Sequence, residues 1–331
     1  MRVAVTGANG HVGVNLCKSL IEKGHQVRAL THQNDFALKQ LPVDLFKGDV
    51  FDPESLKNFL SGVDVVFHLA AKISIYGDPD GSVVRVNTEG TRNIVEACKS
   101  FRIKRLIHFS SIHAFQQSPL NEKLDENRPI VEKGTFAYDR SKAQGERIVM
   151  AAVKDGLNAV VVSPTAIVGP MDFKPGLMGK AILQLYHHQI PALVPGGYNW
   201  VDVRDVVQGA ISAMERGQIG EKYLLSGNWR SLKDFADIIR QTTGQKVTQT
   251  VMPFWVAHIG LPFITMYSRV TGTDPLYTRE SLEIIRNGNR CIINDKARKE
   301  LGYNPRPLEE TVADLIRWFD ENNMLDINNK G

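Results

Sequence analysis

The chain has 331 residues, 43% of them hydrophobic and 23% charged, so it is long enough to bury a large core. Its net charge is +4, and its 40 lysines and arginines are scattered rather than gathered in a run, so we expect no binding to nucleic acid. The three cysteines stand far apart with no CxxC pair, which argues against a cysteine zinc site and favours reduced thiols in the cytoplasm. No ligand cluster with metal-binding spacing is evident in the sequence, so no metal is expected.

The first 170 residues alternate between strand-like and helix-like runs. Apolar runs predict strands at 2–6, 26–31, 43–47, 64–69, 104–109 and 157–162. The segments between most of them predict helices at 11–23, 53–60, 83–100 and 137–155. Such alternation is typical of a parallel sheet wound on both faces by helices. We therefore predict an α/β fold whose residues 1–170 form a dinucleotide-binding domain. A strand that begins at residue 2 also leaves no room for a secretory leader.

After Pro170 helical stretches predominate. Helices are predicted at about 176–188, 204–216, 231–243, 253–270, 277–287, 295–301 and 308–323, with short strands near 192–194 and 221–225. No low-complexity linker separates the two halves. We interpret 171–331 as a smaller, mostly helical substrate-binding lobe that is partly interleaved with the first domain.

The segment 251–267 is the most apolar of the second half. It contains His258 and two prolines and falls short of the roughly 20 apolar residues that a membrane span needs. We expect no transmembrane helix here, but a helix that lines an apolar pocket. A weak contact with a membrane surface is the alternative. The side chains that could roof such a pocket are Phe254, Trp255, Ile259, Leu261, Phe263, Ile264, Met266 and Tyr267.

Three glycines follow the first predicted strand directly. Gly7, Gly10 and Gly13 stand three residues apart, and an amphipathic helix begins behind them. A strand, a glycine turn and a helix allow the backbone to approach a pyrophosphate that lies on the helix N-terminus. The turn therefore predicts a dinucleotide site, with a tight turn and no ligand as the alternative. Its candidate binding residues are Gly7, Asn9, Gly10, His11, Val12 and Gly13.

Candidate residues for proton transfer follow in the order serine, tyrosine, lysine. Ser111 ends the fifth predicted strand, and Tyr138 and Lys142 stand one helical turn apart in YDRSK. A phenol with a pKa of about 10 is a poor acid–base catalyst at neutral pH, and a nearby lysine lowers that pKa. A serine hydroxyl can donate to a substrate oxygen on which charge develops.

The turn TGxxGxxG together with Ser111, Tyr138 and Lys142 resembles the short-chain dehydrogenase/reductase superfamily, whose fold is a Rossmann-type doubly wound sheet. The resemblance implies a nicotinamide dinucleotide that supplies the hydride, and it implies that Lys142 also holds ribose hydroxyls. It further matches Asn87, in NxxGT, to a residue that organises the neighbouring helix and sheet. KGDVFD, HLAAK and SPTAIVGP resemble cofactor-binding segments. They add Asp49, Val50, Leu69, Ala70, Ala71, Pro164 and Ile167 to the predicted cofactor site.

The end of the second predicted strand bears on the choice of dinucleotide. An acid at this position accepts hydrogen bonds from both ribose hydroxyls and repels a 2′-phosphate. Here Thr31 and His32 occupy the position, Arg28 lies nearby, and Asp35 comes only later. The segment therefore favours NADP(H) over NAD(H).

Within the superfamily, the chain is most similar to the extended group of dihydroflavonol-4-reductase-like and 3β-hydroxysteroid-dehydrogenase-like enzymes. This likeness implies an oxidoreductase that interconverts a carbonyl and an alcohol on a bulky, apolar substrate. A nucleotide-sugar epimerase is the first alternative, because it needs only the same serine, tyrosine and lysine. A dehydratase is disfavoured, since Ile112 and His113 stand where such relatives carry an Asp–Glu pair. A dinucleotide-sensing protein without catalysis is the second alternative.

Two further interpretations remain open at this point. His113 could contact the substrate or relay a proton, or it could simply cap the strand end. The likeness also permits a homodimer, because relatives often pair through the helices predicted at 83–100 and 137–155. The apolar residues there are Ile94, Val95 and Ile148.

Overall fold

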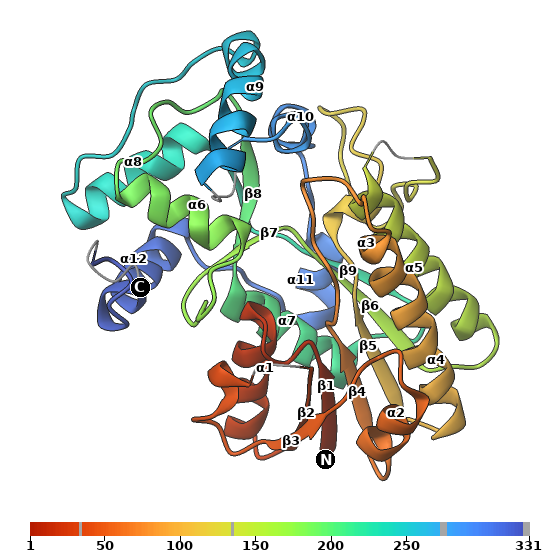
Figure 1. Ribbon diagram of the computed structural model, residues 1–331. Helices are drawn as coiled ribbons and strands as arrows, with labels where there is room; N and C mark the ends of the chain where they lie inside the picture. Colours follow the sequence, from red (N-terminus) through yellow and green to blue (C-terminus); the bar gives the residue numbers. More distant parts are fainter. Residues whose placement is uncertain (33–34, 134–135, 272–276, 327–331) are drawn as a thin grey trace.

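The computed structural model describes residues 1–32, 35–133, 136–271 and 277–326, without the side chains of 263–265 and 267–271. Its larger part is a sheet of seven parallel strands in the order β3-β2-β1-β4-β5-β6-β9 (Figure 1). The strands are β1 (Arg2–Thr6), β2 (Gln26–Thr31), β3 (Asp44–Lys47), β4 (Val65–His68), β5 (Arg105–Phe109), β6 (Ala159–Pro164) and β9 (Lys222–Leu225). The predicted α/β class with a doubly wound parallel sheet is confirmed.

Helices cover both faces of this sheet. One face packs against α1 (His11–Glu22), α7 (Val203–Arg216) and α11 (Asp295–Leu301). The other packs against α2 (Pro53–Leu60), α4 (Thr91–Ser100) and α5 (Ala137–Lys154). Because side chains alternate along a strand, Val3 and Val5 belong to the first core and Ala4 to the second. Strands buried on both faces read as continuous apolar runs, which is why the sequence predicts them well.

The dimer interpretation needs a correction at α4. Ile94 and Val95 are buried in the core of the chain itself, and Ile148 packs against the same core from α5. These side chains therefore stabilise the protomer, and Ile94 and Val95 offer no surface to a second copy.

The helix predicted at 83–100 consists of three pieces. A short α3 (Ser82–Arg85) passes through a π-helical turn at Val86–Gly90 into α4. Within that turn the Asn87 side chain accepts from the Lys72 N–H (2.8 Å) and donates to the Lys72 carbonyl (3.0 Å) and to Ser141 (2.8 Å). Asn87 therefore ties the loop after β4 to helix α5. Irregular turns of this kind are frequent at functional sites.

The second region is built around a three-stranded sheet in the order β10-β8-β7. Its strands are β7 (Ala166–Val168), β8 (Gly197–Asp202) and β10 (Asn228–Ser231). Its helices are α6 (Leu177–Tyr186), α8 (Leu232–Thr243), α9 (Phe254–Thr271), α10 (Arg279–Asn287) and α12 (Leu308–Glu321). The strand predicted at 192–194 is wrong, since only Leu193 forms an isolated bridge, to Val251. The division into domains at residue 170 stays a prediction.

Candidate active site

The turn between β1 and α1 leaves no room for side chains at two of its glycines. Gly7 has a φ of +68°, and a Cβ there would lie 2.8 Å from the Ala70 nitrogen. A Cβ on Gly13 would lie 2.2 Å from the Gly7 carbonyl oxygen. Gly10 is exposed and caps α1 without a side chain, so the first N–H groups of the helix have no side-chain acceptor. Open amides at a helix N-terminus fit the pyrophosphate of a dinucleotide.

Two predicted residues of this turn use their side chains to hold neighbouring segments. The His11 ring shares Nε2 between the carbonyl oxygens of Gly169 (3.0 Å) and Pro170 (3.1 Å). Asn9 accepts from the Ala37 N–H at 3.2 Å. What these residues can offer a cofactor is therefore mainly backbone.

The loop after β4 lies directly over the glycine turn. The Ala70 N–H donates to the Thr6 hydroxyl at 3.2 Å, and the Leu69 N–H donates to the Thr6 carbonyl at 3.2 Å. The predicted segment Leu69, Ala70 and Ala71 is thereby held at the carboxyl edge of the sheet, where β6 also ends at Pro164. Ile167 follows in β7 and packs against the same core as β1.

The predicted adenosine side comes together at the ends of β2 and β3. His32 Nε2 lies 3.3 Å from the Asp49 carboxylate, and both side chains are exposed. Thr31 is buried, with its hydroxyl 3.4 Å from the Phe46 carbonyl. Arg28 does not join them, because its guanidinium donates to the carbonyls of Phe59 (3.2 Å) and Ser61 (2.7 Å) at the end of α2.

The three candidates for proton transfer meet between β5 and α5. The Ser111 hydroxyl hydrogen-bonds the phenol of Tyr138. One turn further along α5, the Lys142 ammonium is buried and donates to the Phe109 carbonyl at 2.6 Å. The structure therefore places all three side chains at the carboxyl end of β5, as their order in the sequence suggested.

The electrostatics of Tyr138 differ from the expectation. Burial raises the pKa of Tyr138 to about 12, against the smaller lowering effect of its hydrogen bond with Ser111. The lowered pKa predicted from the neighbouring lysine is therefore wrong for this structure. Burial lowers the pKa of Lys142 to about 8, while the Glu146 carboxylate acts to raise it. At neutral pH the phenol thus keeps its proton and can act as an acid.

Beneath Lys142 lies a buried polar cluster that the sequence analysis missed. Glu146 is fully buried, forms an ion pair with Lys222 of β9 at 2.6 Å and accepts from the Ser110 hydroxyl at 2.7 Å. The rings of His68 and His108 stack on one another, 5.5 Å between centroids, both interact with the charge of Lys142, and burial lowers the pKa of His68 to about 3. The sequence signal for this cluster was the spacing, since Tyr138, Lys142 and Glu146 follow one another at intervals of four residues.

A cavity of about 210 Å³ ends at Tyr138. Its polar end carries His113, whose Nδ1 lies 3.1 Å from the Asp139 carboxylate. Its other walls are mostly apolar and come from the loop at 73–76 and from α6, α8, α10 and β8, with Lys180 and Gln184 of α6 among the polar exceptions. They include Leu177, Ile182, Leu185, Trp200, Phe235 and Ile285. The arrangement can hold a bulky apolar molecule with one oxygen at the phenol.

The expected roof of this pocket needs a correction. Among the described side chains of α9, none lines the cavity. Ala257 and its neighbours pack against the outside of the cavity wall, whereas Trp255, Ile259 and Met266 are 63–68% exposed. The side chains of Phe263, Ile264 and Tyr267 lie outside the described residues. None of the described helices combines the length and the apolar character that a membrane span requires.

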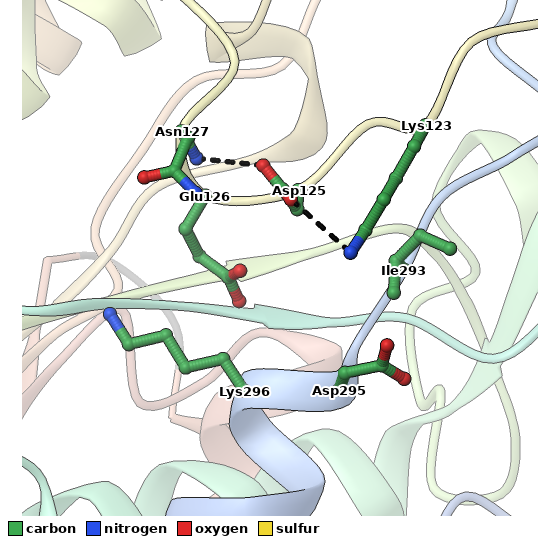
Figure 2. A pocket seen from close by; sticks show the side chains of 7 residues that line it. All are labelled: Lys123, Asp125, Glu126, Asn127, Ile293, Asp295 and Lys296. Atoms are coloured by element: carbon green, nitrogen blue, oxygen red, sulfur yellow. Dashed lines mark hydrogen bonds and ion pairs between the residues drawn. The ribbon is translucent and has the colours of Figure 1, made fainter.

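A second hollow of about 240 Å³ lies between the loop at 123–127 and the start of α11 (Figure 2). Several of its charged side chains form ion pairs or hydrogen bonds with other groups of the chain. Lys123 lies 3.5 Å from Asp125, and Glu126 accepts from the Leu224 N–H at 2.9 Å. None of the predicted site residues lines it.

Comparison with known proteins shows which family the chain belongs to. The model of the NAD dependent epimerase/dehydratase family matches residues 3–226. The chain belongs to this family. It is 32% identical to "Sterol demethylase protein B" of Methylococcus capsulatus, over 98% of this chain and all of the relative. It is also 32% identical to a "Putative dihydroflavonol 4-reductase" of Synechocystis, over 95% of this chain and 93% of the relative. The solved structure of gox2253 is 33% identical, with a TM-score of 0.83 over 98% and 99% of the two chains.

These matches confirm the predicted extended short-chain group and the enzyme class, an oxidoreductase that depends on a nicotinamide dinucleotide. The roles of individual residues, the preference between NADP and NAD, and the substrate go beyond what these matches show.

Proposed function

We propose that the protein is an NADP(H)-dependent oxidoreductase that interconverts a carbonyl and an alcohol on a bulky, largely apolar substrate. The observation that carries this proposal is the apolar cavity that ends on Tyr138, whose phenol is hydrogen-bonded to Ser111. The names of the two relatives refer to a sterol and a dihydroflavonol, which agrees with an apolar substrate.

The chain's own groups divide the work of reduction. Ser111 donates a hydrogen bond to the carbonyl oxygen and orients it. Tyr138 delivers its phenolic proton to that oxygen. The phenol keeps this proton at neutral pH because burial raises the pKa of Tyr138 to about 12. When bound, the cofactor supplies the hydride. The apolar walls exclude water, which strengthens the hydrogen bonds at the oxygen.

The cofactor would be held by groups at the carboxyl edge of the sheet. The open amides of the α1 N-terminus suit the pyrophosphate, and the Lys142 ammonium, which donates to the Phe109 carbonyl, suits ribose hydroxyls. Both predicted roles fit the described geometry.

A preference for NADP(H) is supported by the end of β2, where Thr31 stands in place of an acid. The exposed imidazole of His32 can face a 2′-phosphate. The Asp49 carboxylate orients the ring, but its negative charge partly offsets the attraction between the ring and a phosphate. We expect His32→Ala to reduce the ratio of NADPH to NADH affinity severalfold. Arg28→Ala serves as the control and leaves that ratio unchanged. An unchanged ratio in His32→Ala removes this support for NADP.

The test of the proposed function is NADPH oxidation, followed by absorbance, against a graded panel of aldehydes and ketones. NADH and Tyr138→Phe are the controls. Oxidation that grows with the apolar bulk of the carbonyl compound and disappears in Tyr138→Phe is expected. Tight cofactor binding without net oxidation by any carbonyl would favour an epimerase, which returns its hydride to the substrate.

The cytoplasmic location stays a prediction.

A further inference from the structure

The polar end of the cavity contains a second group besides Tyr138. His113 lies in a single 3-10 turn, Ile112–Ala114, directly after Ser111, and its N–H donates to the Ser111 hydroxyl at 3.2 Å. The His113 ring meets the Tyr138 ring edge-on, with 5.6 Å between centroids. Through these two contacts His113 lies next to Ser111 and Tyr138, the two groups that we propose bind the reacting oxygen.

Asp139 fixes the orientation of the His113 ring. Its carboxylate lies 3.1 Å from Nδ1, and both side chains are partly buried. A ring whose Nδ1 faces a carboxylate directs Nε2 to the opposite side. Since His113 lines the cavity, Nε2 is the ring nitrogen left for a molecule bound there.

The other charged groups near His113 come from α5 and α10. Arg140 follows Asp139 on α5, and the buried Glu280 at the start of α10 accepts from the Gly77 N–H at 3.3 Å. Glu280 interacts electrostatically with Asp139, His113 and Arg140, whereas most of the other residues that line the cavity are apolar, with Lys180 of α6 as a charged exception. A purely hydrocarbon substrate would leave the His113 nitrogen without a partner, which costs binding energy.

We propose that His113 binds a second oxygen of the substrate, on a carbon one or two bonds from the carbonyl that Ser111 and Tyr138 address. The inference rests on the proposed function and narrows its substrate class to ketones with a neighbouring hydroxyl, oxo or carboxyl group. A neutral ring accepts from a hydroxyl, and a protonated ring donates to an oxo or carboxylate oxygen. Asp139 is the positioning residue, because it acts on the substrate only through the ring.

The experiment compares three substrates of equal carbon number. They are a long-chain ketone, the same ketone with a hydroxyl on the adjacent carbon, and the corresponding 1,3-diketone. The kcat and KM of each are measured for the wild type, His113→Leu, His113→Gln and Asp139→Asn. Gln184→Leu is the matched control, because it removes a polar side chain from the cavity wall on α6. Calorimetry with the corresponding alcohols measures binding without turnover.

The wild type should prefer at least one oxygenated ketone over the plain one by roughly tenfold in kcat/KM, the scale of one hydrogen bond. His113→Leu should bring this ratio close to one, mainly by raising the KM of the oxygenated ketone. His113→Gln should restore part of the preference, and Asp139→Asn should reduce it. The preference for the hydroxyketone or for the diketone shows whether the ring accepts or donates.

Three outcomes would overturn the inference. One is a wild-type ratio near one, another is a ratio that His113→Leu leaves unchanged, and the third is an equal loss of preference in Gln184→Leu. In each of them Tyr138-dependent reduction of the plain ketone continues, so the proposed function stands. If the wild type reduces none of the three ketones, the proposed function itself fails and this inference fails with it.

Discussion

The glycine turn after β1 and the cavity that ends at Tyr138 serve the same reaction but are built from different materials. At the turn, backbone meets backbone so closely that a single added carbon at Gly13 would lie 2.2 Å from the Gly7 carbonyl. The cavity is instead lined mainly by aliphatic and aromatic side chains, such as Leu177 and Phe235, that differ from one another in size and shape.

This difference predicts two kinds of response to substitution. A backbone contact has no rotamers through which strain can relax, so changes at the turn should remove cofactor binding altogether. Apolar side chains can repack around a bound molecule, so changes in the cavity wall should alter affinity by degrees. The cavity is therefore the region in which substrate choice can vary while the turn stays the same.

The largest effect is expected at Tyr138, where the cavity ends. Tyr138→Phe removes the proton donor but keeps the ring that packs against His113. We expect kcat/KM for ketone reduction to fall by roughly 10²–10⁴-fold, the usual contribution of a positioned acid. Calorimetry should show NADPH affinity within about twofold of the wild type. Retained turnover would mean that another group delivers the proton.

The next effect tests the turn. Gly13→Ala should abolish measurable NADPH binding and lower the free energy of unfolding by about 1–3 kcal/mol, as overpacking commonly does. Gly176→Ala is the matched control, because Gly176 has an ordinary φ of −74° and nothing lies within 4 Å of its added carbon. Thermal melts and calorimetry of both variants are compared. If Gly13→Ala binds NADPH normally, the tight backbone contact does not shape the cofactor site.

A smaller effect concerns the pH dependence of activity, which depends on the Lys142 ammonium and the buried Glu146 carboxylate next to it. Burial lowers the pKa of Lys142 to about 8, so reduction that needs its ammonium should decline as the pH rises through about 8. The Glu146 carboxylate raises this pKa, so Glu146→Gln should move the decline to lower pH. Lys222→Met removes the cation that opposes this carboxylate and should move the decline to higher pH. A shift of both variants in the same direction would contradict the account.

The smallest effect tests the cavity wall. Leu177→Val removes one methylene group from the half-buried start of α6. Losing contact with one methylene costs about 0.8 kcal/mol, so the KM for a long-chain ketone should rise roughly fourfold. Steady-state kinetics should show kcat nearly unchanged. A loss of kcat as large as that of Tyr138→Phe would remove the distinction between the two regions.

How far the fold could be predicted depends on the region. Most strands of the large sheet are buried and largely apolar, and all seven strands lie at or near predicted positions. The strands β8 and β10 mix aromatic, polar and charged residues, as in NWRS, and no period marks them. In 251–267 nearly every position is apolar, so the sequence could not tell which face of α9 meets the protein.

The candidate site was predictable where its members lie in short motifs. The turn at Gly7 and the pair Tyr138 and Lys142 are local patterns with a physical reason for their spacing. The contacts of His113 with Asp139 and of Glu146 with Lys222 join segments that meet only in the folded chain. The raised pKa of Tyr138 is likewise a consequence of burial, which the spacing to Lys142 does not reveal.

The most direct test of the central claim is to follow the hydride itself. NADPH that carries deuterium at the transferred position is incubated with an apolar ketone that the panel shows to be reduced, and the product is examined by NMR. Deuterium on the carbinol carbon of the alcohol, absent with Tyr138→Phe, is the predicted result. A product without deuterium, or a substrate stereocentre inverted while the label stays on the cofactor, would contradict the account.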